Sequence, residues 1–133
     1  MPFATSSFRL CVSSECIEHT ADPIAAIREM CRVCKPGGLV ILTTPNLIWK
    51  PVLFVAEKMG LRKFRGIENW ISPGAARSEM KKCGMSDFEI TGCHLFPFQV
   101  KFSRPILRFF DRFGDWLYPI MINFGVRARK SGA

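Results

Sequence analysis

Two short apolar runs flank a segment in which apolar residues recur every three to four positions. The runs cover residues 8–13 (FRLCVS) and 39–43 (LVILT), and their continuous hydrophobicity is typical of strands buried in a parallel sheet. Between them, the helical stripe consists of Ile24, Ile27, Met30, Cys31 and Cys34. Strand, helix and strand with short connections predict one right-handed βαβ unit.

Both ends of this helix carry residues that favour helix termini. Asp22 is suited to the N-cap, and Pro23 is compatible with the first turn because its missing N–H has no partner there. At the other end, the run 35–38 (KPGG) supplies a basic last turn, a proline that cannot continue the helix, and glycines that tolerate positive φ. The helix is therefore expected to end in this run.

Beyond residue 46 the pattern predicts two more helices before the next strand. The first covers residues 51–59, ends at Gly60 and leads into the basic turn 61–66 (LRKFRG). The second begins at Ser72 as N-cap, has Pro73 in its first turn and stops at Gly84. Three of its side chains are expected to face the core: Ala75, Met80 and Cys83.

The last part of the chain predicts a strand over residues 88–93 (FEITGC), a helix over 105–117 and a final strand over 121–130. The helix is amphipathic, with an apolar face and a separate arginine face. The two faces consist of Ile106, Phe109, Phe110, Phe113 and Leu117, and of Arg104, Arg108 and Arg112. The final strand alternates between apolar and polar residues, which indicates a half-exposed position in the sheet.

Size and composition describe one α/β domain, or a part of one. The chain has 133 residues, of which 48% are hydrophobic, and no uncharged apolar run is long enough to predict a membrane-spanning helix. The amino-terminal residues MPFATSSFRL lack the pattern of a signal peptide. The six cysteines lack the spacing of a zinc site, so we expect free thiols in a reduced, cytoplasmic protein.

The positive charge is concentrated in two segments that are also rich in aromatic residues. The formal net charge is +8. Residues 47–65 carry five basic side chains against Glu57 alone, and residues 101–133 carry seven against Asp111 and Asp115. Because each segment follows the carboxyl end of a predicted strand, both are expected on the side of the sheet where ligands bind in doubly wound folds.

Residues 13–46 (SSECIEHTADPIAAIREMCRVCKPGGLVILTTPN) closely resemble the fourth-strand to fifth-strand block of class I S-adenosylmethionine-dependent methyltransferases. Ubiquinone-biosynthesis-type O-methyltransferases are the nearest group. The later pattern is similar to the family's fifth helix and its sixth and seventh strands. The family's sheet order is 3-2-1-4-5-7-6, so the resemblance implies a partial Rossmann-like fold with a half sheet of strands 4-5-7-6, flanking helices and a final antiparallel strand.

The resemblance also implies roles for four residues. Ser14 lies at the strand tip that borders the cofactor's methionine end in the family. Glu15, Glu18 and His19 are similar to a divalent-metal site of some quinone methyltransferases, which would hold Mg²⁺ and orient an acceptor hydroxyl. His19 is also a candidate general base. The alternative is that Glu18 and His19 only cap the next helix and fix the loop.

The family's glycine-rich cofactor loop is absent from these 133 residues, as is the acidic residue that holds the ribose hydroxyls. Residues 1–133 are therefore expected to form the carboxyl-terminal half of a methyltransferase domain. Its first strand would then be an open edge, which invites association with another chain that supplies the amino-terminal half. The sheet face opposite the predicted helices would expose apolar surface.

Within this half domain, residues 47–66 and 95–120 are expected to form basic-aromatic lid segments. Three hypotheses account for their composition: aromatic side chains that pack inward beneath a solvated basic surface, a surface that meets anionic lipid, or a nucleic-acid site. No recognition motif supports the third hypothesis. The second would make a cytoplasmic protein membrane-associated.

The resemblance implies S-adenosylmethionine-dependent methyl transfer to a small, apolar acceptor that is quinone-like or lipid-like. The alternative is a non-catalytic remnant that binds a membrane or a partner chain. The two hypotheses differ in whether S-adenosylmethionine binds.

Overall fold

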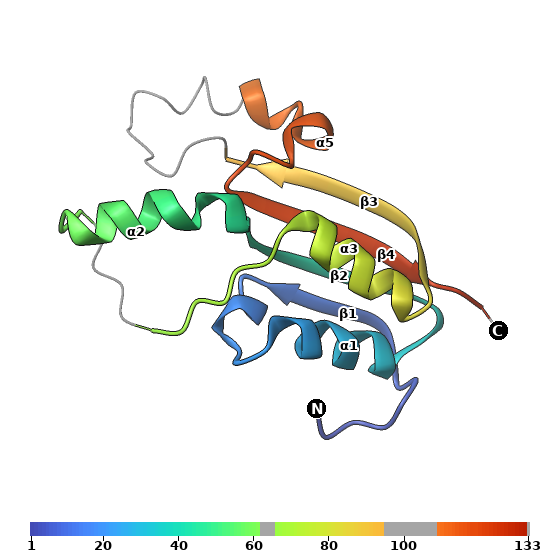
Figure 1. The fold of residues 1–133 in the computed structure, drawn as a ribbon. Coiled ribbons are helices and arrows are strands. Elements are labelled where there is room, and N and C mark those ends of the chain that lie inside the picture. The colour runs from blue at the N-terminus through green and yellow to red at the C-terminus, as the bar shows by residue number, and fades with distance from the viewer. Residues whose placement is uncertain (62–65, 95–108, 133) are drawn as a thin grey trace.

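The computed structural model describes residues 1–61, 66–94 and 109–132. Its centre is a four-stranded sheet in the order β1-β2-β4-β3 (Figure 1). The strands are β1 (Phe8–Ser14), β2 (Cys34–Pro45), β3 (Met85–Cys93) and β4 (Asn123–Lys130). β1 and β2 are parallel, and β4 lies antiparallel to both β2 and β3. This confirms the predicted half sheet with a final antiparallel strand.

Two helices, α1 (Pro23–Val33) and α3 (Pro73–Lys82), contact each other and lie over the same face of the sheet (Figure 1). Short 3₁₀ turns, η1 (Ile17–His19) and η2 (Leu47–Trp49), follow β1 and β2. The helix α2 (Lys50–Lys58) extends outward from η2, and the one-turn helix α5 (Gly114–Leu117) packs against β3. No helix of the described residues is long and apolar enough to cross a membrane.

The hydrophobic core lies between the sheet and the helices α1 and α3. Alternate residues of the strands point into it because successive strand side chains face opposite sides of a sheet. From α1, Ile27, Met30 and Cys31 face this layer at helical spacing, as the sequence predicts. The strands contribute Val40, Leu42, Phe124, Val126 and Ala128, all fully buried.

Two details of the predicted core differ in the structure, one in the element and one in the position. Cys34 is buried, but it is the first residue of β2 and not the last of the helix, which ends at Val33. On α3, Ala75 is exposed and Ala76 is buried in its place. The helix begins at Pro73, and the face defined by Ala76 and Met80, four residues apart, turns toward the core.

Both caps that the sequence predicts are present. The Asp22 carboxylate accepts a hydrogen bond from the Ala25 backbone N–H at 2.9 Å, and the Ser72 hydroxyl accepts one from the Ala75 N–H at 3.1 Å. These bonds satisfy N–H groups that have no partner within the helix. Gly84 follows α3 as predicted, with a φ of +77°. The predicted helix end in the run 35–38 is wrong, because α1 ends at Val33 and the run lies within β2, although Gly37 has the expected positive φ of +74°.

On the face of the sheet opposite α1 and α3, the described residues place only the short helix α5, at the end of β3. On β1, which is predicted as a buried strand, Leu10 and Val12 project onto this face and are 53% and 61% exposed. β1 also forms one edge of the sheet, so its outer N–H and C=O groups have no neighbouring strand. The expected open edge and exposed apolar surface are therefore both features of the structure.

The predicted helix over residues 105–117 lies partly outside the described residues. In the part described, residues 109–111 are helical and a turn at 112–113 precedes α5. A Cβ atom at Gly114 would collide with the backbone oxygen of Gly92, so α5 approaches β3 more closely than any other residue type would allow. The prediction of one continuous helix is therefore wrong in this part, because the chain turns to bring Gly114 onto β3.

Asn46 joins the end of β2 to the segment that leads into β4. Its side chain is 1% exposed, and its Nδ2 donates hydrogen bonds to the carbonyls of Tyr118, Pro119 and Met121 at 3.3, 2.9 and 3.2 Å. Its Oδ1 accepts from the Ile48 N–H at 3.4 Å. One buried amide thus satisfies several backbone groups of two loops that are distant in sequence.

We expect Asp22→Ala to lower the free energy of unfolding by about 1 kcal/mol, because the N–H of Ala25 loses its partner. Urea denaturation followed by circular dichroism measures the change. Ser78→Ala, at an exposed interior position of α3, is the control and should change stability far less. Equal effects of the two substitutions would contradict the capping role.

We expect Asn46→Ala to lower the free energy of unfolding by about 1–3 kcal/mol, more than the loss of a cap, because buried carbonyls lose their donor. Asn123→Ala is the matched control, since this half-buried asparagine makes a single side-chain bond to an exposed carboxylate at the same edge of the sheet. The same denaturation experiment compares the two. An Asn46 variant as stable as the Asn123 variant would show that the buried amide does not hold the two loops together.

Candidate functional site

The candidate site lies at the edge of the sheet where β1, β2 and β3 end and β4 begins. Ser14 is paired with Thr43, Thr43 with Gly125, and Gly125 with Thr91, so these four residues form one row across the sheet. In open α/β sheets, ligands bind beyond the carboxyl ends of the strands. The row therefore marks the border of the expected ligand crevice.

Ser14 and Thr43 form a polar pair at the tips of the two parallel strands. The Thr43 hydroxyl donates a hydrogen bond to the Ser14 hydroxyl at 3.3 Å. The backbone N–H of Glu15 approaches the same threonine, at 3.0 Å from its carbonyl and 3.2 Å from its hydroxyl. Glu15 has a φ of +46°, a conformation that is uncommon for a residue with a side chain and that turns the chain out of the strand.

The Glu15 carboxylate lies over the start of β4, where it accepts a hydrogen bond from Asn123 Nδ2 at 3.2 Å. Burial raises the pKa of the Glu15 carboxyl, and the negative charge of Glu18 adds to the rise. The Thr43 hydrogen bond, His19 and His94 act in the opposite direction. Glu15 therefore keeps its proton to a higher pH than a surface glutamate.

The side chain of Glu18 lies on the opposite face of the sheet from that of Glu15. Its side chain is only 2% exposed and accepts a hydrogen bond from the Thr44 hydroxyl at 3.2 Å. Thr43 and Thr44 are neighbours on β2, so their side chains lie on opposite faces of the sheet. The carboxylate of Glu15 therefore lies on the side of the sheet opposite α1 and α3, here called the open face. The carboxylate of Glu18 lies on the side that α1 and α3 cover.

His19 lies on the exposed side of η1. Its Nδ1 is 3.0 Å from the backbone oxygen of Ile67, an acceptor, so Nδ1 carries the proton in this contact. Asn69 secures the same loop, because its Nδ2 donates to the carbonyls of Thr20 and Ala21 at 2.9 and 3.2 Å. Its backbone N–H also donates to the Glu18 carbonyl at 2.7 Å.

Glu15, Glu18 and His19 do not form one cluster. No group of three or more His, Cys, Asp and Glu side chains is arranged to hold a metal ion within the described residues. The Mg²⁺ prediction therefore has no support from the structure. The observed contacts are those expected of the alternative, in which Glu18 and His19 fix the loop, although the N-cap of α1 is Asp22 and not either of them.

Several residues that shape the site were not predicted from the sequence. Thr43 and Asn123 hold Ser14 and Glu15, and Asn69 fastens the η1 loop. At His94, the backbone N–H donates to the Asp111 carboxylate at 2.8 Å, and the ring lies close enough to lower the pKa of Glu15. Polar residues at predicted strand ends were the available signal for Thr43 and Asn123.

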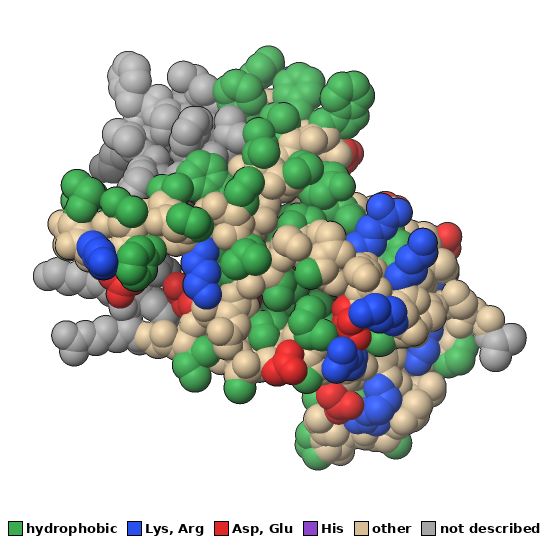
Figure 2. All heavy atoms as spheres, in the orientation of Figure 1, with side chains coloured by type: hydrophobic (Ala, Val, Ile, Leu, Met, Phe, Trp, Pro, Cys, Tyr) green, Lys and Arg blue, Asp and Glu red, His purple; other side chains and the backbone are tan. Residues whose placement is uncertain are grey.

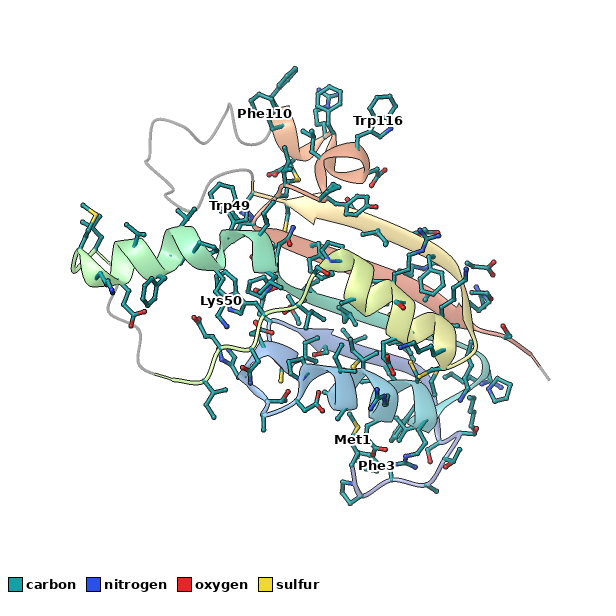
Figure 3. The ribbon with its side chains drawn as sticks, viewed as in Figure 1. Met1, Phe3, Trp49, Lys50, Phe110 and Trp116 are labelled. Atoms are coloured by element: carbon teal, nitrogen blue, oxygen red, sulfur yellow. The ribbon has the colours of Figure 1, made fainter. Side chains whose placement is uncertain are left out.

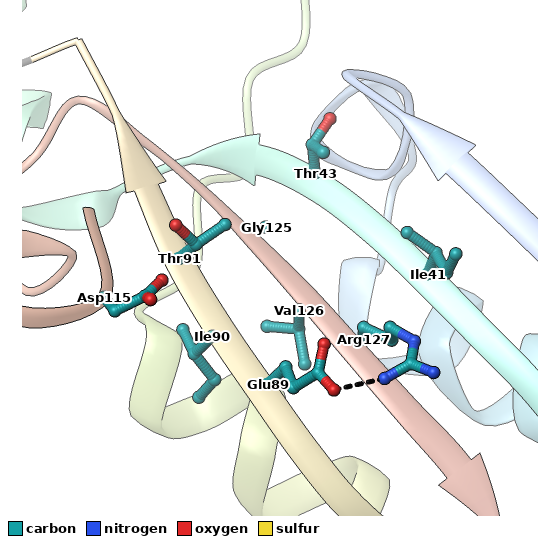
Figure 4. Close-up of a pocket in the computed structure, with 9 residues that line it drawn as sticks. All are labelled: Ile41, Thr43, Glu89, Ile90, Thr91, Asp115, Gly125, Val126 and Arg127. Atoms are coloured by element: carbon teal, nitrogen blue, oxygen red, sulfur yellow. Dashed lines mark hydrogen bonds and ion pairs between the residues drawn. The ribbon is translucent and has the colours of Figure 1, made fainter. Parts of the chain in front are cut away.

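A cavity of about 620 Å³ begins at this row and extends over the open face of the sheet (Figure 4). Its floor includes Ile41 and Thr43 of β2 and the Glu89–Arg127 ion pair of β3 and β4. Asp115 of α5 lies at its margin. A second cavity of about 450 Å³ lies between η2, the start of α3 and residues 118–119.

Comparison with known proteins identifies the lineage of the chain. The family described as "Methyltransferase domain" matches residues 1–42. An uncharacterised methyltransferase of Mycobacterium leprae (strain Br4923) is 36% identical over 97 residues, which are 73% of this chain and 33% of the relative. One of Mycobacteroides abscessus is 35% identical over 101 residues, or 76% of this chain and 36% of the relative. The chain thus spans about a third of the length of the curated relatives it matches.

Solved structures share the fold. A methyltransferase from Thermotoga maritima, described as S-adenosylmethionine-dependent, superposes with a TM-score of 0.66 at 18% identity, covering 98% of this chain and 60% of that one. A Haemonchus contortus N-methyltransferase, solved with phosphomonomethylethanolamine and S-adenosylhomocysteine, gives a TM-score of 0.59 at 15% identity and covers 98% and 35%. Family match, relatives and fold agree: each relates this chain to methyltransferases, and its fold is that of part of the S-adenosylmethionine-dependent structures.

Proposed function

We propose that this chain contributes the substrate side of a methyltransferase domain that transfers a methyl group from S-adenosylmethionine to a small, apolar acceptor. The observation that carries the proposal is the row Ser14–Thr43–Gly125–Thr91 at the carboxyl edge of a sheet with the family's strand order. The resemblance to quinone O-methyltransferases suggests a quinone-like or lipid-like acceptor with a hydroxyl group.

The residues present fit one wall of a cofactor site. Ser14 is exposed, its hydroxyl is oriented by Thr43, and it ends the strand whose outer edge is open. S-adenosylmethionine supplies an electrophilic methyl group on a sulfonium. The 133 residues contain no GxGxxG turn, so the contacts to the rest of the cofactor are assigned to a region outside them.

His19 is the proposed general base for the acceptor hydroxyl. Its Nδ1–H is directed at the Ile67 carbonyl, which fixes the tautomer in which Nε2 is the basic nitrogen. In this role, Nε2 takes the hydroxyl proton as the acceptor oxygen is methylated. Glu15 lies close enough to the imidazole for His19 to lower the pKa of the Glu15 carboxyl, against the rise that burial causes.

The open edge of β1 and the open face of the sheet are the proposed contact surface for the remainder of the domain. Leu10 and Val12 expose apolar area beside unpaired backbone groups, which is the combination that an added strand and its helix would bury. The remainder would come from the same polypeptide or from a partner chain. The rival function, a non-catalytic module that binds a membrane or a partner, is favoured by the missing glycine turn.

A chimera tests the cofactor proposal. We expect a protein in which the upstream part of the Mycobacterium leprae relative precedes this chain to bind S-adenosylmethionine in calorimetry, whereas the 133 residues alone bind weakly or not at all. Ser14→Lys in the chimera should lower the affinity at least about ten-fold. Ser131→Lys, exposed at the other end of the sheet, is the control. A folded chimera that does not bind would favour the non-catalytic module.

His19→Asn in the same chimera tests the general base. Asparagine keeps a donor for the Ile67 carbonyl but has no basic nitrogen, so a catalytic role predicts a fall in kcat of about 10²–10⁴-fold. Single-turnover methylation of a catechol-type acceptor measures the effect, and S-adenosylmethionine affinity serves as the control readout. Unchanged kcat would leave His19 with the role of fixing the loop alone.

A further inference from the structure

The helix α2 leaves almost all of its apolar surface in solvent. Ala56 is its one buried residue, and Val52, Phe54 and Val55 are about half exposed. A surface helix of a globular protein normally directs such side chains into the core. Their exposure here indicates a surface that is covered by something other than the described part of the chain.

The exposed side chains of α2 form an ordered pattern. Val52, Val55 and Met59 are spaced by three and four residues, which aligns them along one side of the helix. A separate row, on the far side of the helix axis from this stripe, consists of Lys50, Phe54 and Lys58 at intervals of four, and the Lys58 ammonium lies 4.8 Å from the centre of the Phe54 ring. An apolar stripe on one side of a helix, with lysines on another side, is the pattern of helices that lie in a lipid interface.

A second group of exposed aromatic residues surrounds α5. Trp116 is 88% exposed, and Phe109 and Phe113 are about half exposed with ring centres 5.5 Å apart. Ile120 adds a further exposed apolar side chain. A tryptophan side chain that stays in water contributes little hydrophobic stabilisation to the fold. Its amphipathic ring is, however, favoured at the boundary between lipid headgroups and acyl chains.

Both groups emerge from the carboxyl edge of the sheet and are tied together near their bases. Trp49, immediately before α2, donates from its Nε1 to the Ile120 carbonyl at 2.8 Å. Figure 3 shows Trp49 and Lys50 at the start of α2, and Phe110 and Trp116 beyond the end of β3. Hydrophobic side chains gather over α2 and over the α5 region in Figure 2.

The two sequence segments that contain these groups carry more basic than acidic side chains, which favours an anionic partner. In the sequence, residues 47–65 carry five basic side chains against one acidic, and residues 101–120 carry four against two. Those in the described residues are Lys50, Lys58 and Arg112, with Glu57, Asp111 and Asp115. The combination of exposed Trp, Phe and aliphatic side chains with Lys and Arg matches an anionic lipid surface, which takes up apolar area and attracts basic charge at once. A nucleic acid would leave the aliphatic stripe of α2 in water.

We propose that α2 and residues 109–120 form a peripheral membrane-binding surface for anionic lipid. The apolar stripe of α2 and the aromatic residues around α5 enter the interface, and Lys50 and Lys58 meet the lipid headgroups. The candidate site at the carboxyl edge then faces the membrane from which an apolar acceptor would enter. The surface itself does not depend on methyl transfer, and its test needs no enzymatic activity.

Liposome flotation of the full chain tests the proposal, because floated protein is bound to vesicles whereas aggregated protein stays at the bottom. Phosphatidylcholine vesicles are compared with vesicles that contain about one-quarter phosphatidylglycerol. We expect binding to the anionic vesicles, weakened at high salt. Lys50→Gln with Lys58→Gln should reduce partitioning about 25-fold, or about five-fold for each charge. Lys35→Gln with Lys81→Gln, exposed at the opposite edge of the sheet, is the matched control.

Fluorescence quenching by brominated lipid locates the contact. Of the three tryptophans, Trp70 is buried and Trp49 is half-buried, so Trp116 should account for most of the quenching. Trp116→Phe keeps the apolar character and should retain vesicle binding while losing most of the signal. Val55→Asp with Met59→Asp, both at exposed positions, should abolish flotation without changing the circular dichroism spectrum.

Equal binding to neutral and anionic vesicles, or no flotation from either, would overturn the proposal. So would an unchanged signal in the Trp116 variant, since lipid would then contact another surface. Binding of a single-stranded oligonucleotide in place of vesicles, lost in the Lys50 and Lys58 double variant, would assign the surface to nucleic acid. A stable, salt-resistant dimer that buries Trp116 would assign it to a second copy of the chain.

Discussion

The structure depends on the hydrogen bonding of β2 along both of its sides. β2 is paired with β1 in parallel and with β4 in the antiparallel sense, and its inward residues Val40 and Leu42 lie at the centre of the core. A strand paired on both sides has no unsatisfied backbone groups, so it can be fully buried. The elements that carry the candidate site are positioned by this strand: Thr43 orients Ser14 and Glu15, Thr44 binds Glu18, and Asn46 joins the two loops beyond it.

The exposure of β1, in contrast to the burial of β2, follows from the same requirement that backbone N–H and C=O groups be paired. β1 has comparable apolar residues but only one neighbouring strand, and Leu10 and Val12 remain exposed on the face of the sheet opposite α1 and α3. The fold neighbours superpose on nearly the whole chain but only on part of their own length. The fold neighbours are therefore longer than this chain, and β1 presents an edge at which a further strand can pair.

The sequence predicted the strands and the caps because those features depend on local patterns, whereas the strand order was implied by the resemblance to the family. Asp22 and Ser72 act within a few residues of their partners, so their roles can be read from the chain alone. The errors concern long-range contacts. The break before α5 depends on Gly114 meeting Gly92 across the fold, and the separation of Glu15 from Glu18 depends on adjacent threonines of β2 that face opposite ways. Proximity in sequence suggested a three-residue cluster, but it could not show which side of the sheet each carboxylate would reach.

The antiparallel direction of β4 has a consequence for how this fold can change over evolution. Cys93 ends β3 and Asn123 begins β4, and the two are paired directly across the sheet. The intervening chain therefore leaves and re-enters at one point, so its length and content can vary without altering the register of any strand. The stretch between β2 and α3 returns in the same way, since the Leu47 N–H bonds to the Ile71 carbonyl. Both basic-aromatic segments therefore begin and end at one edge of the sheet, where a change in their length need not shift the pairing of the strands.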